Sequence, residues 1–98
     1  IKIETIKINN TILEYNKVIY IDSVNGNDET GEGTKETPYQ TLQKAMQNIT
    51  YNNQEAIYLN KGFYTVDAIH DMFDCKGVDF IGKGKNTTIE IKMLLDNI

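Results

Sequence analysis

The sequence predicts a mostly β fold with one amphipathic helix, arranged as the start of a solenoid. Two strand–turn–strand segments resemble each other, EAIYLNKGFYTV at residues 55–66 and GVDFIGKGKNTTIEI at residues 77–91. A repeat of this size indicates a solenoid, in which each unit buries its apolar face only against its neighbours. One helix interrupts the strands, because Leu42, Ala45, Met46 and Ile49 have the i, i+3, i+4, i+7 spacing of a single helix face.

The period of the repeat depends on which residues are matched. Matching the two Lys-Gly pairs gives a period of 22, whereas matching Ile57 to Val78 gives a period of 21. A slip of one position exchanges the two faces of a strand. We prefer 21, because it keeps apolar side chains inside and leaves Tyr58 and Asp79 on the outer face.

An earlier unit of the repeat precedes the helix. The strand KVIYID at residues 17–22 contains VIYI, which resembles AIYL at residues 56–59. Residues 1–15, IKIETIKINNTILEY, read as a hairpin or two short strands, with Asn9-Asn10 suited to the turn. The chain therefore divides into residues 1–16, a lead-in hairpin, and residues 17–98, a capping helix and the first units of an incomplete solenoid.

Residues 22–41, named the acidic loop below, are rich in Gly, Asn, Asp, Glu and Thr. We interpret this loop as a structural corner that delivers the helix to the end of the stack as a cap. Its glycines, Gly26, Gly31 and Gly33, permit φ > 0 at sharp turns. The side chains of Asn27 and Asp28 can accept hydrogen bonds from nearby backbone amides.

The start of the helix is signalled by a Thr-Pro pair. Thr37 is the expected N-cap, and Pro38 suits the first helical position, where its missing N–H is not needed. Gln40 then completes a capping-box pattern. The helix is expected to end between Thr50 and Asn53.

The loop, helix and following strands together resemble a known group of proteins. The order is a strand ending in Asp22, then NGND, Gly-Thr, Pro-Tyr-Gln-Thr with a helix, and finally IYL with Gly62 and Tyr64. This order is similar to the N-terminal region of right-handed parallel β-helix proteins of the pectin-lyase-like superfamily. The resemblance covers roughly residues 18–84. It implies the start of a right-handed parallel β-helix, truncated after two to three rungs, in a secreted or cell-surface protein.

The resemblance specifies architecture more closely than activity. The superfamily includes polysaccharide lyases and glycoside hydrolases as well as phage tailspikes and surface proteins. In its lyases a basic residue and calcium act on central rungs, which this chain lacks, so no catalytic residue can be assigned and enzymatic activity stays undecided. The expected function is a non-catalytic N-terminal segment of an extracellular or cell-surface protein that binds or processes polysaccharide. The alternative is a structural segment of a β-helical adhesin, phage fibre or surface stalk.

Four carboxylates of the acidic loop are the only candidates for a calcium site. Oxygen ligands of this kind suit calcium, and the set is Asp22, Asp28, Glu29 and Glu32. The spacing fails the EF-hand pattern, because Tyr39 stands where the bidentate glutamate belongs. We therefore expect a solvated structural loop with no cofactor in this segment, although calcium is possible in a larger parent protein. The alternative is that the acidic loop is itself a calcium site that couples stability to extracellular ions. A phosphate loop is excluded, since the glycines do not form GxxxxGK[ST].

The single histidine and the single cysteine occur together in DAIHDMFDC at residues 67–75. His70, Asp74 and Cys75 include borderline metal ligands, and a Cys–His pair is also a candidate for nucleophilic catalysis. No second His or Cys is present, so we expect a free buried cysteine, with Ile69, Met72 and Phe73 as packing residues.

Composition narrows the range of partners. The 98-residue chain has a formal net charge of −4, and its ten basic residues are all lysines. Without arginine there is no planar fork for phosphate, and no basic stripe appears in the sequence, so nucleic-acid binding is not expected. No long apolar run is present, so no membrane insertion is expected.

The end of the sequence suggests self-association. Ile89 and Ile91 are expected to point into the stack, and MLL at residues 93–95 has no later unit to cover it. Open strand edges and uncovered apolar side chains promote association. We therefore expect a homodimer through the open C-terminal end, alongside polysaccharide binding by the parent protein.

Overall fold

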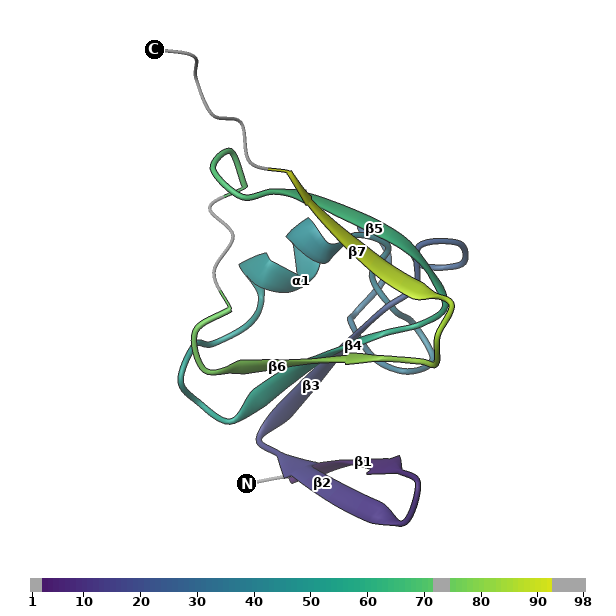
Figure 1. Ribbon diagram of the computed structural model, residues 1–98, viewed down its shortest axis with the longest axis vertical. Helices are drawn as coiled ribbons and strands as arrows, with labels where there is room; N and C mark the ends of the chain where they lie inside the picture. Colours follow the sequence, from purple (N-terminus) through teal and green to yellow (C-terminus); the bar gives the residue numbers. More distant parts are fainter. Residues whose placement is uncertain (1–2, 72–74, 93–98) are drawn as a thin grey trace.

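The computed structural model describes residues 3–71 and 75–92 (Figure 1). The first two strands, β1 (Glu4–Ile8) and β2 (Thr11–Tyr15), pair antiparallel, with Glu4 opposite Tyr15. Asn9 has φ 55°, a left-handed conformation that asparagine tolerates in tight turns. The hairpin predicted for residues 1–15 is thus confirmed.

Three parallel strands form the central sheet. They are β3 (Lys17–Ile21), β4 (Glu55–Leu59) and β6 (Val78–Gly82), in the order β3-β4-β6. Ile19 lies opposite Ile57, so the predicted correspondence between VIYI and AIYL is confirmed.

The register between β4 and β6 differs from the predicted one. The preferred period of 21 places Val78 opposite Ile57, whereas Val78 lies opposite Glu55 and Phe80 lies opposite Ile57. The preferred period is therefore wrong by two residues, the distance from Val78 to Phe80. Because the shift is an even number of positions, the alternation of faces is still the expected one.

A second parallel pair, β5 (Gly62–Asp67) and β7 (Thr87–Lys92), lies above the central sheet in the view of Figure 1. Gly62 lies opposite Thr87 in this pair. Tyr64 and Val66 of β5 are buried, whereas Phe63 and Thr65 are exposed, which is the alternation of a strand with one face on a core.

The two faces of the central sheet pack against different elements. Ile19, Ile21, Ile57 and Leu59 face the main core, which α1 (Leu42–Gln47) and β5 complete. The residues between them face the hairpin, where a second cluster consists of Ile6, Tyr15, Val18 and Ala56. Because both faces of the parallel strands are covered, β3 and β4 read as almost continuous apolar runs.

The acidic loop runs beside the free edge of β3. Tyr20 donates its backbone N–H to the carbonyl of Gly33 (2.8 Å) and accepts a backbone hydrogen bond from Tyr39 (3.0 Å). Ile21 and Tyr39 form a parallel bridge. The loop thereby satisfies backbone groups that an uncovered edge strand leaves exposed.

Gly33 is the one glycine of the acidic loop with positive φ, at 76°. Gly26 and Gly31 instead permit close backbone approach: a Cβ on Gly26 would lie 2.1 Å from the carbonyl oxygen of Tyr39. The expectation of φ > 0 at all three glycines is therefore wrong for two of them.

The helix is shorter than predicted and begins later. Its N-cap is Thr41, whose hydroxyl accepts a hydrogen bond from the backbone N–H of Lys44 (3.2 Å). Thr37 as N-cap and Pro38 as first helical residue are thus wrong, because Thr37 belongs to a turn in which its carbonyl accepts from Glu32 and Gly33. The predicted end near residues 50–53 is also wrong, since α1 ends at Gln47.

The predicted β-helix, and with it the resemblance to the pectin-lyase-like superfamily, is wrong. The described strands divide into three small sheets, of two, three and two strands, and one of these is antiparallel. Over residues 3–71 and 75–92 they form neither a closed structure nor a solenoid.

The spacing of the paired strands gives the physical reason. The segments that join Ile19 to Ile57, Ile57 to Phe80 and Gly62 to Thr87 differ in length, where a solenoid requires a constant period. The helix contributes buried residues to the main core between the sheets instead of capping a stack (Figure 1). The fold is a small mostly-β globule with one short helix.

Several side chains expected in the interior lie at the surface. Ile91 is 49% exposed and Ile69 59% exposed, whereas Ile89 is partly buried against the main core. Cys75 is free but exposed, so the expectation of a buried thiol is wrong. Met72, Phe73 and residues 93–95 lie outside the described residues.

Candidate functional site

A cleft of about 290 Å³ lies between the hairpin and the outer face of the central sheet. Three elements distant in sequence each contribute a lysine: β1, the acidic loop and the turn after β6. Two tyrosines from neighbouring strands and Asn60 complete the polar lining. The lining residues are Thr5, Ile6, Lys7, Tyr20, Lys35, Tyr58, Asn60 and Lys83.

The fold holds each of these segments in place. Ile6 is buried against Val18 and Ala56, which anchors the hairpin on the sheet and places Lys7 beside the cleft. The backbone N–H of Lys83 donates to the carbonyl of Leu59 (2.9 Å), so the chain leaving β6 stays beside β4.

Backbone hydrogen bonds also hold the segments that contain Asn60 and Lys35. The backbone N–H of Asn60 donates to the carbonyl of Ile21 (2.9 Å). Lys35 lies in a turn closed by the Thr34 hydroxyl, which accepts from the Thr37 backbone N–H (3.0 Å). The ends of the parallel strands and the acidic loop thus meet at one edge.

Tyr20 and Tyr58 form the aromatic part of the cleft. They are register partners on β3 and β4, with ring centroids 5.2 Å apart and planes tilted by 43°. Burial raises the pKa of the Tyr20 phenol, and the nearby Glu4 carboxylate, Tyr58 and the Glu36 carboxylate raise it further. The phenol therefore stays protonated near neutral pH and can donate a hydrogen bond to an anion.

A second cleft of about 270 Å³ adjoins the first and shares Asn60 and Lys83 with it. Its remaining lining residues are Asp22, Val24, Asn25 and Lys61. The two clefts form one feature, named the lysine groove below. Its basic residues are Lys7, Lys35, Lys61 and Lys83, and its floor contains Tyr20, Tyr58 and Asn60.

Among the described residues, the charges of the lysine groove are not neutralised by ion pairs. Over residues 3–71 and 75–92, no carboxylate lies within ion-pair distance of any of its four lysines. All four lysines are exposed. Four lysines and one carboxylate, that of Asp22, line the two clefts, so the lining is positively charged although the Glu4 and Glu36 carboxylates lie near Tyr20. Lysine ammonium groups and phenol hydroxyls are donors, so the arrangement suits an anionic ligand.

The carboxylates considered for calcium serve the backbone of the acidic loop. Asp22 Oδ1 accepts from the N–H groups of Val24 (3.0 Å) and Asn25 (2.9 Å). Glu32 Oε1 accepts from the Thr37 hydroxyl (3.2 Å). The side chain of Asn27, and not that of Glu29, organises the next turn by accepting from the backbone N–H groups at positions 29 and 30.

Asp28 ties the acidic loop to the start of α1. Its Oδ1 accepts from the N–H groups of Gln40 (2.7 Å) and Thr41 (3.0 Å), and its Oδ2 accepts from the Thr41 hydroxyl (2.6 Å). Partial burial opposes ionisation, but these hydrogen bonds and the charge of Lys44 prevail and lower the pKa of Asp28. No three His, Cys, Asp or Glu residues gather into a metal-binding group in the part of the chain that the structure describes.

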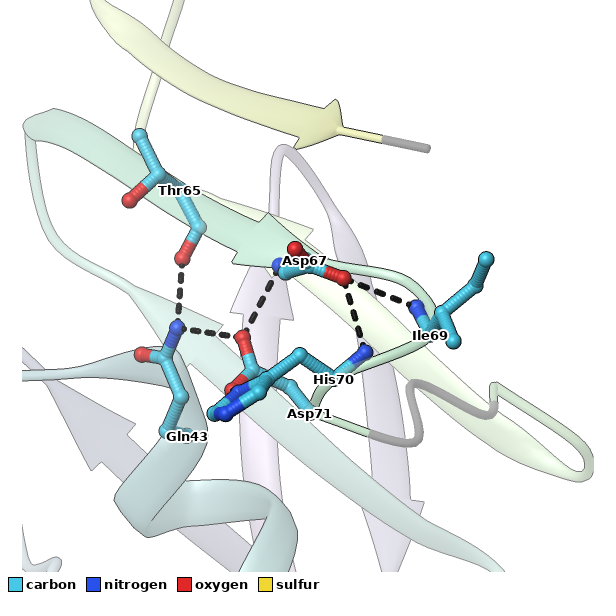
Figure 2. A network of polar contacts seen from close by, with 6 residues as sticks. All are labelled: Gln43, Thr65, Asp67, Ile69, His70 and Asp71. Carbon is cyan, nitrogen blue, oxygen red and sulfur yellow. Dashed lines mark hydrogen bonds and ion pairs between the residues drawn. The ribbon is translucent and has the colours of Figure 1, made fainter. Parts of the chain in front are cut away.

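His70 and Cys75 do not form a catalytic or metal-binding pair in the described part of the chain. The His70 imidazole is 85% exposed and lies 3.4 Å from Asp71 Oδ1. Cys75 is exposed, and Asp74 lies outside the described residues. What the structure brings together instead is His70, Asp71, Asp67 and Gln43 (Figure 2).

Sequence reasoning missed the lysine groove because its four lysines are spread over residues 7–83. One signal was available. Lys61 and Lys83 belong to the two Lys-Gly pairs, and each follows the carboxyl end of a parallel strand, β4 or β6.

Comparison with protein-family models, curated proteins and solved structures finds no match to this chain. The inference of function therefore rests on the site itself. Over the described residues, helical structure long and apolar enough to cross a membrane is not found.

Proposed function

We propose that this chain is a non-catalytic module that binds an acidic polysaccharide in the lysine groove. The observation that supports the proposal is the convergence of Lys7, Lys35 and Lys83 around the Tyr20–Tyr58 pair. Lys61 extends the line of positive charge into the adjoining cleft.

The chemistry of the groove matches a charged sugar polymer. Carboxylate or sulfate groups repeat along such a polymer, and the flexible lysines can each meet one as a point charge. Tyrosine rings offer flat apolar surface together with a hydroxyl, which complements a sugar ring with one apolar face and a rim of hydroxyl groups. The extracellular or cell-surface location expected from the sequence remains a prediction.

The affinity expected from this site is modest. Exposed ion pairs contribute about 0.2–1 kcal/mol each, so four contribute roughly 1–4 kcal/mol. A dissociation constant of about 1 mM corresponds to about 4.1 kcal/mol. Binding in this range is expected at low salt and should weaken as salt screens the exposed charges.

The decisive experiment is an NMR titration with oligogalacturonate, with a neutral dextran oligomer as the comparison ligand. Shifts should appear in the groove with oligogalacturonate only. The double variant Lys35→Gln/Lys83→Gln should weaken binding roughly two- to thirtyfold. Lys92→Gln is the control for each of the two single variants, because it removes one positive charge from β7, where Lys92 lies 3.9 Å from Glu90.

Three results would overturn the proposal: equal binding of the neutral oligomer, an equal loss of affinity in Lys92→Gln, or no binding at low salt. Tighter binding of single-stranded DNA than of the oligosaccharide would replace the polysaccharide with a nucleic acid. The non-catalytic part has its own assay. Lyase cleavage of a uronate creates an unsaturated product that absorbs in the ultraviolet, and a steady rise in absorbance with pure protein would contradict it.

A further inference from the structure

A separate cleft of about 430 Å³ lies on the helix side of the molecule. Its lining comes from α1, the segment after it and the turn after β5: Gln43, Met46, Gln47, Tyr51, His70 and Asp71. The main core faces this side of the central sheet, whereas the lysine groove lies on the hairpin side. The two features share no lining residue.

One wall of this cleft contains a carboxylate held in a fixed position (Figure 2). Asp71 Oδ2 accepts from the Gln43 side-chain amide (3.0 Å) and from the backbone N–H of Asp67 (2.8 Å). The same Gln43 nitrogen donates to the carbonyl of Thr65 (2.9 Å). Because both partners of that nitrogen are acceptors, the orientation of the Gln43 amide is determined.

The Asp71 carboxylate gives this cleft a negative charge near neutral pH. The hydrogen bond from Gln43 lowers the pKa of Asp71, and the backbone N–H of Asp67 and the neighbouring His70 act in the same direction. Asp67 Oδ1 accepts from the backbone N–H groups of Ile69 (3.0 Å) and His70 (2.7 Å). The lining contains no lysine, and its one imidazole, that of His70, lies 3.4 Å from Asp71 Oδ1 and is 85% exposed.

Two further lining residues, Met46 and Tyr51, are apolar or aromatic. Met46 is buried except for 9% of its surface and packs in the main core. Tyr51 is partly buried against the same core. A thioether is polarizable and an aromatic face attracts cations, so both groups favour a positively charged ligand with an apolar surface.

We propose that this cleft binds a small organic ammonium ion, with Asp71 as the counterion and Tyr51 and Met46 as the apolar walls. The volume falls within the range of sites for small ligands. An organic cation fits better than a metal ion, because a metal needs several ligands and the described residues contain no group of three His, Cys, Asp or Glu.

The first test needs no variant. Choline and its uncharged carbon isostere, 3,3-dimethylbutan-1-ol, differ in charge and hardly in shape. In NMR titrations of the intact chain, choline should shift the amide signals of residues 43–51 and 67–71, and the isostere should bind more weakly. Equal affinity for the two ligands, or no shifts with choline at tens of millimolar, would refute the proposal.

Variants then locate the site. Asp71→Asn should remove most of the preference for choline over the isostere, leaving the contribution of the Tyr51 ring, and Tyr51→Leu should reduce the affinity for choline about two- to fivefold. Glu90→Gln is the charge control, because it removes an exposed carboxylate on β7 that is not among the lining residues. An Asp71→Asn protein that keeps its circular dichroism spectrum and prefers choline as strongly as the parent protein would rule out the assigned counterion. If that variant does not fold, the ligand pair still decides the question.

Discussion

Replacing Gly33 by alanine tests how the acidic loop is held against the central sheet. Gly33 is buried and has φ 76°, a conformation in which a Cβ is strained. A Cβ at this position would lie 2.7 Å from Cε2 of Tyr39 and 3.3 Å from Cγ2 of Ile19. The Tyr39 ring would have to move, although its backbone is bonded to β3 through Tyr20 and Asp22.

A second glycine separates the two costs of this substitution. Gly84 also has φ 76°, but a Cβ there would have no atom within 4 Å. Gly84→Ala should therefore show the backbone strain alone, about 1–2 kcal/mol. Gly33→Ala should add the cost of forcing a methyl group into a packed site, typically about 1–3 kcal/mol, for a total of about 2–5 kcal/mol. Folding stabilities are about 5–15 kcal/mol, so this loss is a large fraction.

Urea unfolding monitored by circular dichroism measures both variants. With an m-value of about 1–3 kcal/mol per molar urea, the midpoint of Gly33→Ala should fall by roughly 0.7–5 M. Gly84→Ala should unfold between Gly33→Ala and the unsubstituted protein. Equal stability of the two variants would show that the contacts with Tyr39 and Ile19 do not constrain position 33. A Gly33→Ala protein as stable as the parent would refute the left-handed conformation itself.

Three further predictions follow from contacts elsewhere in the fold. Because the folded-state pKa of Asp28 is lowered, its hydrogen bonds with Thr41 stabilise the protein above the unfolded-state pKa of about 4 and are lost as pH falls below it. Asp28→Asn should therefore cost about 1–3 kcal/mol at pH 7 and flatten the acid limb of a curve of stability against pH. An unchanged acid limb would contradict this. Burial raises the pKa of Tyr15 to about 12, and the hydrogen bond to Asp79 (2.7 Å) and the charge of Asp79 act in the same direction. The free energy of unfolding should therefore fall by roughly 2–3 kcal/mol as pH rises from about 10 to 12. An ultraviolet titration in which Tyr15→Phe leaves the tyrosine signal near pH 12 unchanged would be inconsistent with this pKa. The homodimer expected from the sequence also stays a prediction. Because Ile91 is 49% exposed on β7, Ile91→Lys should weaken self-association in sedimentation runs at several concentrations. An unsubstituted chain that is monomeric at all of these concentrations would exclude the dimer.

Much of the secondary structure follows from local pattern. The β-branched and aromatic alternation in residues 17–21, 55–59 and 62–67 sufficed to place β3, β4 and β5, because half-buried strands select such residues on either face. The resemblance between VIYI and AIYL even predicted the register of β3 on β4. The side chains that hold the acidic loop, above all Asp28, were also identified from residue type.

The helix boundary shows where local signals fail. Thr37-Pro38 is a sound start signal, yet Thr41 is the N-cap. The decision depends on Asp28, thirteen positions earlier, whose carboxylate binds the amides of Gln40 and Thr41. Such long-range hydrogen bonds override a local capping preference whose contribution is about 1 kcal/mol.

By itself, the sequence determined the strands, the hairpin and the presence of one amphipathic helix, because period and residue type act over a few positions. The tertiary structure alone decided how the strands divide into sheets, since pairing between β4 and β6 or between β5 and β7 depends on contacts between segments far apart in the chain. It also decided the sites. Lys7, Lys35, Lys61 and Lys83 become one groove, and Gln43 meets Asp71, only when the chain brings distant segments together. A linear sequence records charge at each position, whereas a binding site depends on the distances between those charges in space.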